Sequence, residues 1–230
     1  MAEGFSSETI GFLIELRMRN DRAWYNEHKP DYERLVLRPF QALVSALAPT
    51  IARIDPLIDT TPAVGKTISR IYRDSRFSSD KSFYRDRVWI TFERKIKEEG
   101  YDVPAFYFEL TPSGYSYGAG YYYVSVKTMD NFRAMIDRDA EAFLKIVEPI
   151  AKNGALAAHG DMYKRSRYTG ADARIAEWYN RKNLYVAAGF DGVSDAFCFG
   201  GLVSRLEDGF AALAGIYHFM CGAAFDEAAR

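Results

Sequence analysis

The chain is 230 residues long, with 48% hydrophobic and 27% charged residues, which fits one large soluble domain spanning 1–230. Its formal net charge of −1 gives no overall attraction to nucleic acid or anionic lipid, so we expect neither as a partner. Cys198 and Cys221 form no C-x-x-C pattern, and the first residues lack the basic and apolar segments of a signal peptide. These features predict reduced thiols and a cytoplasmic location.

The first quarter of the chain has the apolar spacing of helices. Residues 6–16 and 20–25 each begin with capping residues, Ser-Ser in the first case and Asn-Asp in the second. A third helical pattern covers residues 32–47. Pro39 lies inside this pattern and should kink or divide the helix, because proline has no N–H and clashes with the preceding turn.

The middle of the chain has the composition of strands. Residues 67–73, 88–92 and 106–110 are rich in β-branched and aromatic side chains. A Thr-Pro-Ser-Gly turn then leads into a second hairpin strand at 115–126. Glycines at 118 and 120 interrupt that strand and predict a bulge or a close backbone approach. If the strand is regular, four odd-numbered tyrosines share one of its faces: Tyr115, Tyr117, Tyr121 and Tyr123.

The last part of the chain returns to helical patterns. We expect helices at 128–135, 141–152 and 175–181, a short strand at 184–187 and a long C-terminal helix over 202–217. The uncharged run 209–225 is too short for a membrane span, which favours a buried helix, with a homodimer interface through this helix as the alternative. Helices, then strands, then helices predict an α+β fold. Its largely antiparallel central sheet, from the middle of the chain, packs with N-terminal and C-terminal helices.

The densest charge cluster lies in residues 70–87, where six cations and three carboxylates alternate with aromatic residues. A strand, a polar turn at 78–80 and a second strand would bring the cations to one end of the sheet. Guanidinium groups bind phosphate and carboxylate bidentately, so the cluster predicts a site for an anionic small molecule. The predicted ligand-binding residues are Arg70, Arg73, Asp74, Arg76, Asp80, Lys81, Tyr84 and Arg85.

Other interpretations of the cluster stay open. The arginines and aspartates could only pair with one another, as an ion-pair clamp in a non-catalytic interaction or structural module. A third hypothesis is a Mg²⁺-dependent nuclease, in which Asp74, Asp80 or Asp86 would act with Glu93 and Lys95 at the end of the next strand. The sequence does not decide whether the chain is an enzyme.

Further signals for a cofactor are weak. The histidines have no paired spacing for zinc, and the G-x-G at 118–120 lacks the downstream glycine and helix of a dinucleotide loop, so we predict no cofactor and no metal site. A second basic cluster, Lys164, Arg165 and Arg167, is either a solvated loop or a second wall of the same anion site.

The pattern Arg70-x-x-Arg73-Asp74-x-Arg76-Phe77-x-x-Asp80-Lys81-x-x-Tyr84 resembles the signature of a bacterial family, domain of unknown function 2461. The segments 20–29 and 181–186 are similar to the early and late segments of the same family. The resemblance spans most of the chain as a single unit. It implies a soluble bacterial protein and assigns no reaction, substrate or cofactor.

Overall fold

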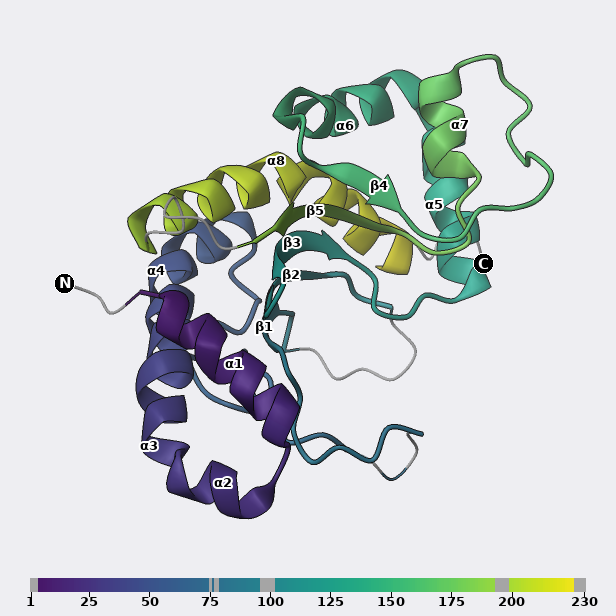
Figure 1. Ribbon diagram of the computed structural model, residues 1–230. Helices are drawn as coiled ribbons and strands as arrows, with labels where there is room; N and C mark the ends of the chain where they lie inside the picture. Colours follow the sequence, from purple (N-terminus) through teal and green to yellow (C-terminus); the bar gives the residue numbers. More distant parts are fainter. Residues whose placement is uncertain (1–3, 75, 77–78, 96–101, 193–198, 226–230) are drawn as a thin grey trace. The chain divides into compact units, whose positions relative to one another are not determined.

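The computed structural model describes residues 4–74, 76, 79–95, 102–192 and 199–225 (Figure 1). Its helical elements are α1 (Ser7–Arg19), α2 (Arg22–Glu27), α3 (Lys29–Tyr32), the π-helical η1 (Glu33–Leu37), α4 (Arg38–Ile54), α5 (Val126–Arg138), α6 (Ala140–Asn153), α7 (Ala173–Tyr179) and α8 (Phe199–Phe225). Its strands are β1 (Val88–Phe92), β2 (Ala105–Thr111), β3 (Gly114–Gly120), β4 (Ala157–His159) and β5 (Tyr185–Asp191).

The strands form one antiparallel sheet in the order β1-β2-β3-β5-β4, which confirms the predicted α+β class (Figure 1). The edge strand β4 was not predicted. It pairs antiparallel with β5, with Ala158 opposite Val186. Its sequence, Ala-Ala-His, carries no β-branched residue, so the pairing partner and not local propensity makes it a strand.

The chain falls into two compact units. The first comprises Met1–Phe92, Tyr107–Tyr117 and Gly189–Glu207, and the second comprises Glu93–Phe106, Gly118–Ala188 and Asp208–Arg230. Strands β2, β3 and β5 and helix α8 each have residues in both units. The single domain 1–230 stays a prediction.

In the first unit, the third predicted helix contains Pro39 but is not divided by it, because the helical stretch continues from Lys29 to Ile54. The π-helical η1 comes immediately before α4, and Pro39 lies in the first turn of α4. Proline cannot donate to the carbonyl four residues earlier, which belongs to Leu35. The hydroxyl of the fully buried Thr9 donates to that carbonyl at 2.8 Å instead. Helix α1 therefore compensates for the hydrogen bond that Pro39 removes.

Together α3, η1 and α4 form a continuous helical stretch, Lys29–Ile54, that is long and apolar enough by composition to cross a membrane. Core helices of soluble proteins pass the same test. Phe40 and Leu43 on α4 are fully buried, and the ring centroid of Phe40 lies 5.9 Å from that of Phe108 on β2. The stretch thus behaves as a core helix of the first unit, while the cytoplasmic location stays a prediction.

In the second unit, the hairpin strand is shorter than predicted. Because β3 ends at Gly120, Tyr121 is buried whereas Tyr123 is 74% exposed, so the four tyrosines do not share one face. Gly120 does mark a close backbone approach, since a Cβ there would lie 2.4 Å from the Cα of Tyr185. Helix α5 begins two residues earlier than the predicted 128, and the side chain of Ser125 caps it by accepting from the Thr128 amide at 3.1 Å.

Candidate functional site

The predicted site residues lie in the first unit, on two antiparallel segments, 67–74 and 82–91, that we call the ribbon; the second segment runs into β1 (Figure 1). Isolated bridges pair Ile68 with Ile90 and Tyr72 with Tyr84. The amide of Arg85 donates to the carbonyl of Ile71 at 2.9 Å. The predicted strand over 67–73 is therefore present only as isolated bridges, and Ser78 of the predicted turn lies outside the described residues.

At the tip of the ribbon, cations and carboxylates pair with one another. Nη2 of Arg76 lies 2.7 Å from Oδ2 of Asp74, and Nη1 of Arg73 lies 3.2 Å from Oδ2 of Asp80. Hydrogen bonds from the side chain and the backbone of Arg76 lower the pKa of Asp74 to about 2. Asp80 also accepts from the Ser82 amide at 2.9 Å, which confirms the expected turn contact and lowers its pKa. The tip therefore meets the description of an ion-pair network.

The base of the ribbon is different because Arg85 has no carboxylate at ion-pair distance among the described residues. Its Nη1 donates to two carbonyls, those of Arg70 and Tyr72, at 2.8 and 3.0 Å. Its guanidinium lies over the Trp89 ring, 4.9 Å from the centroid. Burial lowers the pKa of Arg85, and the nearby positive charge of Arg73 lowers it further. The negative charge of Asp74 acts in the opposite direction but less strongly, so Arg85 is a partly desolvated cation whose charge is only partly compensated.

Two more arginines contribute positive charge near Arg85. Arg70 is exposed, has no ion-pair partner in the part of the chain that is described, and lies against Gly65, where a Cβ would be 3.5 Å from its Nε. Arg73 pairs with Asp80 at the tip, but its charge also acts on Arg85, and its Nε is buried without a hydrogen-bond partner. The third carboxylate of the cluster, Asp86, pairs with Arg87 at 3.2 Å. With all three carboxylates engaged in other pairs, Arg70 and Arg85 are cations without an ion pair among the described residues.

One face of the ribbon packs on aromatic residues of the N-terminal helices. Tyr84 is 2% exposed and stacks on Tyr25 of α2, with ring centroids 4.4 Å apart. Tyr72 lies 5.1 Å from Tyr84, and Tyr32 lies 5.8 Å from Tyr25. Burial raises the pKa of Tyr32 to about 12, with further contributions from Tyr72 and Glu33. Tyr32 is therefore protonated at neutral pH, and Tyr84 stabilises the ribbon by packing.

Sequence analysis missed Asn20, which holds the ribbon against α1. Its Oδ1 accepts from the amides of Phe83 and Tyr84 at 2.6 and 3.1 Å, and its Nδ2 donates to the Tyr84 carbonyl at 3.0 Å. Asn20 ends α1 in the left-handed conformation, with φ at 43°. The only sequence signal was the Asn-Asp pair, of which Asp21 is indeed a cap, accepting from the Trp24 amide. An asparagine can adopt this backbone conformation, but its long-range partners leave no local pattern.

The other predicted residues lie in the second unit. In the second basic cluster, Nη1 of Arg167 is 3.1 Å from Oδ1 of Asp130, and its guanidinium lies over the Tyr163 ring at 4.6 Å. Lys164 and Arg165 are exposed. Whether this cluster forms a second wall of the anion site stays a prediction. Glu93 and Lys95 of the nuclease hypothesis also belong to this unit. Among the described residues, no group of three or more His, Cys, Asp or Glu side chains could hold a metal ion.

Fold and site together define an α+β protein with a basic, two-stranded ribbon next to its central sheet. The chain belongs to the family described as "Conserved hypothetical protein (DUF2461)", whose family model matches residues 8–219. This match confirms the resemblance expected from the charged signature. A search of curated proteins gives no match.

Proposed function

We propose that the chain is a binding protein or enzyme for a small molecule with a phosphate or carboxylate group, held at the base of the ribbon by Arg85 with Arg70 and Arg73. The observation that carries the proposal is that the partly buried Arg85 has no ion pair among the described residues. Its Nη1 is used by backbone carbonyls, while no hydrogen bond within the described residues uses Nε or Nη2. These two nitrogens form the edge of a guanidinium that binds oxyanions bidentately.

The surroundings of Arg85 support an anion in particular. The Trp89 ring and the two carbonyls fix the guanidinium, so little side-chain entropy would be lost on binding. Burial and the positive charge of Arg73 both lower the pKa of Arg85. A bound anion would oppose both effects, because a nearby negative charge stabilises the charged guanidinium. The tip contributes less, because Arg76 is already paired with Asp74.

Titration calorimetry with phosphate tests the proposal, with chloride at equal ionic strength as the reference. We expect saturable phosphate binding that Arg85→Met abolishes. Arg85→Lys keeps the charge but loses the fork, so it should weaken binding about tenfold or more. Arg174→Met is the matched control, because Arg174 is an exposed arginine paired with Asp172 in the other unit. No phosphate binding by the folded wild type, or unchanged binding by Arg85→Met, would refute the proposal.

A second candidate is a non-catalytic interaction or structural module whose charged cluster is a clamp. The ion pairs at the tip, Arg73 with Asp80 and Arg76 with Asp74, favour it. Both aspartates are about half exposed, however, and such pairs typically contribute only about 0–1 kcal/mol. The clamp alternative predicts that Arg73→Ala lowers the melting temperature markedly. The small contribution of such exposed pairs predicts instead that the melting temperature is nearly unchanged, and that result would refute the clamp.

A further inference from the structure

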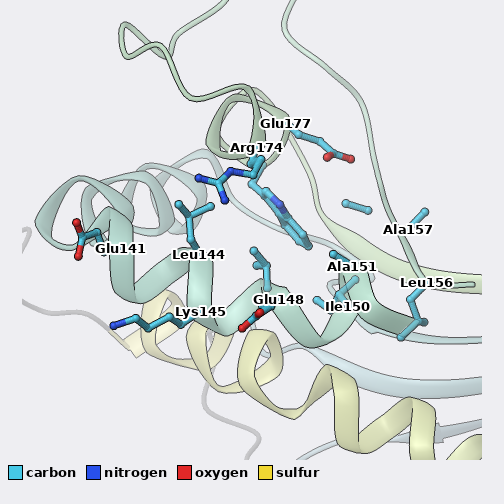
Figure 2. A pocket seen from close by; sticks show the side chains of 13 residues that line it. Glu141, Leu144, Lys145, Glu148, Ile150, Ala151, Leu156, Ala157, Arg174 and Glu177 are labelled. Carbon is cyan, nitrogen blue, oxygen red and sulfur yellow. The ribbon is translucent and has the colours of Figure 1, made fainter. Parts of the chain in front are cut away.

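A cavity of about 580 Å³ lies in the second unit between α6, β4 and α7 (Figure 2). Its walls are mainly apolar, and the residues that matter here are Leu144, Val147, Ile150, Leu156, Ala157 and Trp178. This volume is within the range of roughly 300–1,000 Å³ that is usual for small-molecule sites. None of the residues of the proposed anion site lines it.

One residue that lines the cavity, Trp178, has a polar group without a partner in the described part of the chain. Trp178 is 5% exposed, and its ring packs edge-on against Phe143 with centroids 5.8 Å apart. Its indole N–H has no hydrogen-bond partner among the described residues, and it is accessible to solvent rather than buried. A ligand with a hydrogen-bond acceptor would replace water at this N–H.

The charged residues around the cavity do not favour a charged ligand. Glu148 pairs with Lys152 at 2.8 Å, and Arg174 pairs with Asp172 at 2.7 Å. Glu177 lies 3.5 Å from Arg181. The two that remain without an ion pair in the described chain, Glu141 and Lys145, have opposite signs and lie at the end of the cavity away from Leu156 (Figure 2). An ion buried in the apolar part would therefore lose hydration without gaining a partner.

An extended peptide is not favoured either, although β4 is an edge strand next to the cavity. Peptide strands bind to sheet edges through unpaired backbone groups. The amide of Lys182 donates to the carbonyl of Asp161, and the amide of Tyr163 donates to the carbonyl of Asn180. Along β4 and the residues that follow it, the backbone groups of odd-numbered residues therefore point towards β5 and the segment that precedes β5. The carbonyls of Ala158 and Gly160 therefore point outward, and Arg181 donates to both, at 2.8 and 3.1 Å. These acceptors of the edge are already occupied.

We propose that this cavity binds a small, uncharged and mostly apolar molecule whose hydrogen-bond acceptor pairs with the indole N–H of Trp178. The ligand's apolar body lies against Leu144, Ile150 and Leu156. This site is independent of the anion site proposed at Arg85 and goes beyond it.

Indole N–H correlations in ¹⁵N-labelled protein give a direct test, because the chain has three tryptophans, Trp24, Trp89 and Trp178. The probes are 2-nonanone, octanoate and octylammonium, which are similar in size but neutral, anionic and cationic. We expect 2-nonanone to shift only the Trp178 signal, which the Trp178→Phe variant identifies by its disappearance. Its Kd should be at least about tenfold lower than those of the two ions.

Ala151→Leu should fill the cavity from α6 and abolish the shift, since Ala151 lines it (Figure 2). Ala155→Leu makes the same change at an exposed position outside the lining and should bind like the wild type. The signals of Trp24 and Trp89 show whether each variant is folded. The proposal is overturned if no probe shifts Trp178, if an ion binds as tightly as the ketone, or if folded Ala151→Leu binds normally.

Discussion

At the scale of single residues, the charged cluster separates into two kinds of arginine. Arg76, whose side chain is 77% exposed, pairs with a neighbouring carboxylate in solvent. Arg85 is partly buried, is held by two carbonyls and has no such partner in the described structure. The same residue type therefore forms a local ion pair at the tip and, at the base, carries a charge that Asp74 only partly compensates. The second arrangement is the one on which the proposed anion site rests.

The lowered pKa of Asp74 predicts a particular acid response. An aspartate in an unfolded chain titrates near about 3.9, and Asp74 in the folded chain titrates near 2. Its contribution to stability is therefore fully present above the unfolded pKa and is lost as the pH falls through the folded pKa. We expect the stability difference between the wild type and Asp74→Asn to be constant above pH ~5 and to vanish towards pH ~2. Urea denaturation at several pH values measures it, and a carboxyl titration midpoint near the unfolded value would contradict it.

Asn20 predicts a loss of stability that does not depend on charge. Asn20→Gly keeps the left-handed backbone accessible but removes three hydrogen bonds to residues 83 and 84. Two backbone amides would lose their acceptor, so we expect a loss of about 2–3 kcal/mol in the free energy of unfolding. Ser45→Gly, which removes one exposed side-chain hydrogen bond within a helix, serves as a control for the cost of glycine. A loss no larger than that of the control would show that Asn20 does not hold the ribbon.

At the scale of elements, the N-terminal helices illustrate how one residue's defect is corrected by another element. Pro39 removes a hydrogen bond from the Leu35 carbonyl, and the π-helical η1 lies at this point of the chain. Thr9 of α1 supplies the missing donor. Helix α1 is therefore joined to the helical stretch by a buried polar contact as well as by apolar packing.

The Thr9→Val variant tests this role. Valine has a similar shape but no hydroxyl, so the buried Leu35 carbonyl and the Ser6 amide would both lose a partner. We expect the free energy of unfolding to fall by about 1–3 kcal/mol, measured by urea denaturation. Thr9→Ser keeps the hydroxyl and should lose less, and equal losses in the two variants would contradict the argument.

At the scale of the whole molecule, three strands and α8 have residues in both compact units. Neither unit keeps these elements intact if the other unfolds. We therefore expect one cooperative unfolding transition, as for a single domain.

Tryptophan positions allow this expectation to be checked. Trp24 and Trp89 report on the first unit and Trp178 on the second. In Trp178→Phe the emission reports on the first unit, and in the double variant Trp24→Phe, Trp89→Phe it reports on the second. Within each variant, the urea midpoint measured by emission should equal the midpoint measured by circular dichroism. Separate midpoints for fluorescence and circular dichroism within one variant would indicate two domains.

Much of the fold was predictable from local patterns. Apolar spacing located α1 and α4, and β-branched and aromatic residues located β1 and β2. Pro39 marked where the helix changes, and the charged signature identified the family. These features depend on neighbouring residues, whose chemistry the sequence displays directly.

Other features depended on partners that are distant in sequence. β4 is a strand because β5 pairs with it, and the contacts of Asn20 involve residues more than sixty positions away. The sequence identified the arginines of the cluster, but it could not separate Arg76, which pairs with a carboxylate, from Arg85, which two carbonyls and Trp89 hold. The cavity at Trp178 likewise gave no sequence signal. Local propensity and periodicity are properties of the sequence itself, whereas charge compensation and burial depend on which distant residues the tertiary structure brings together.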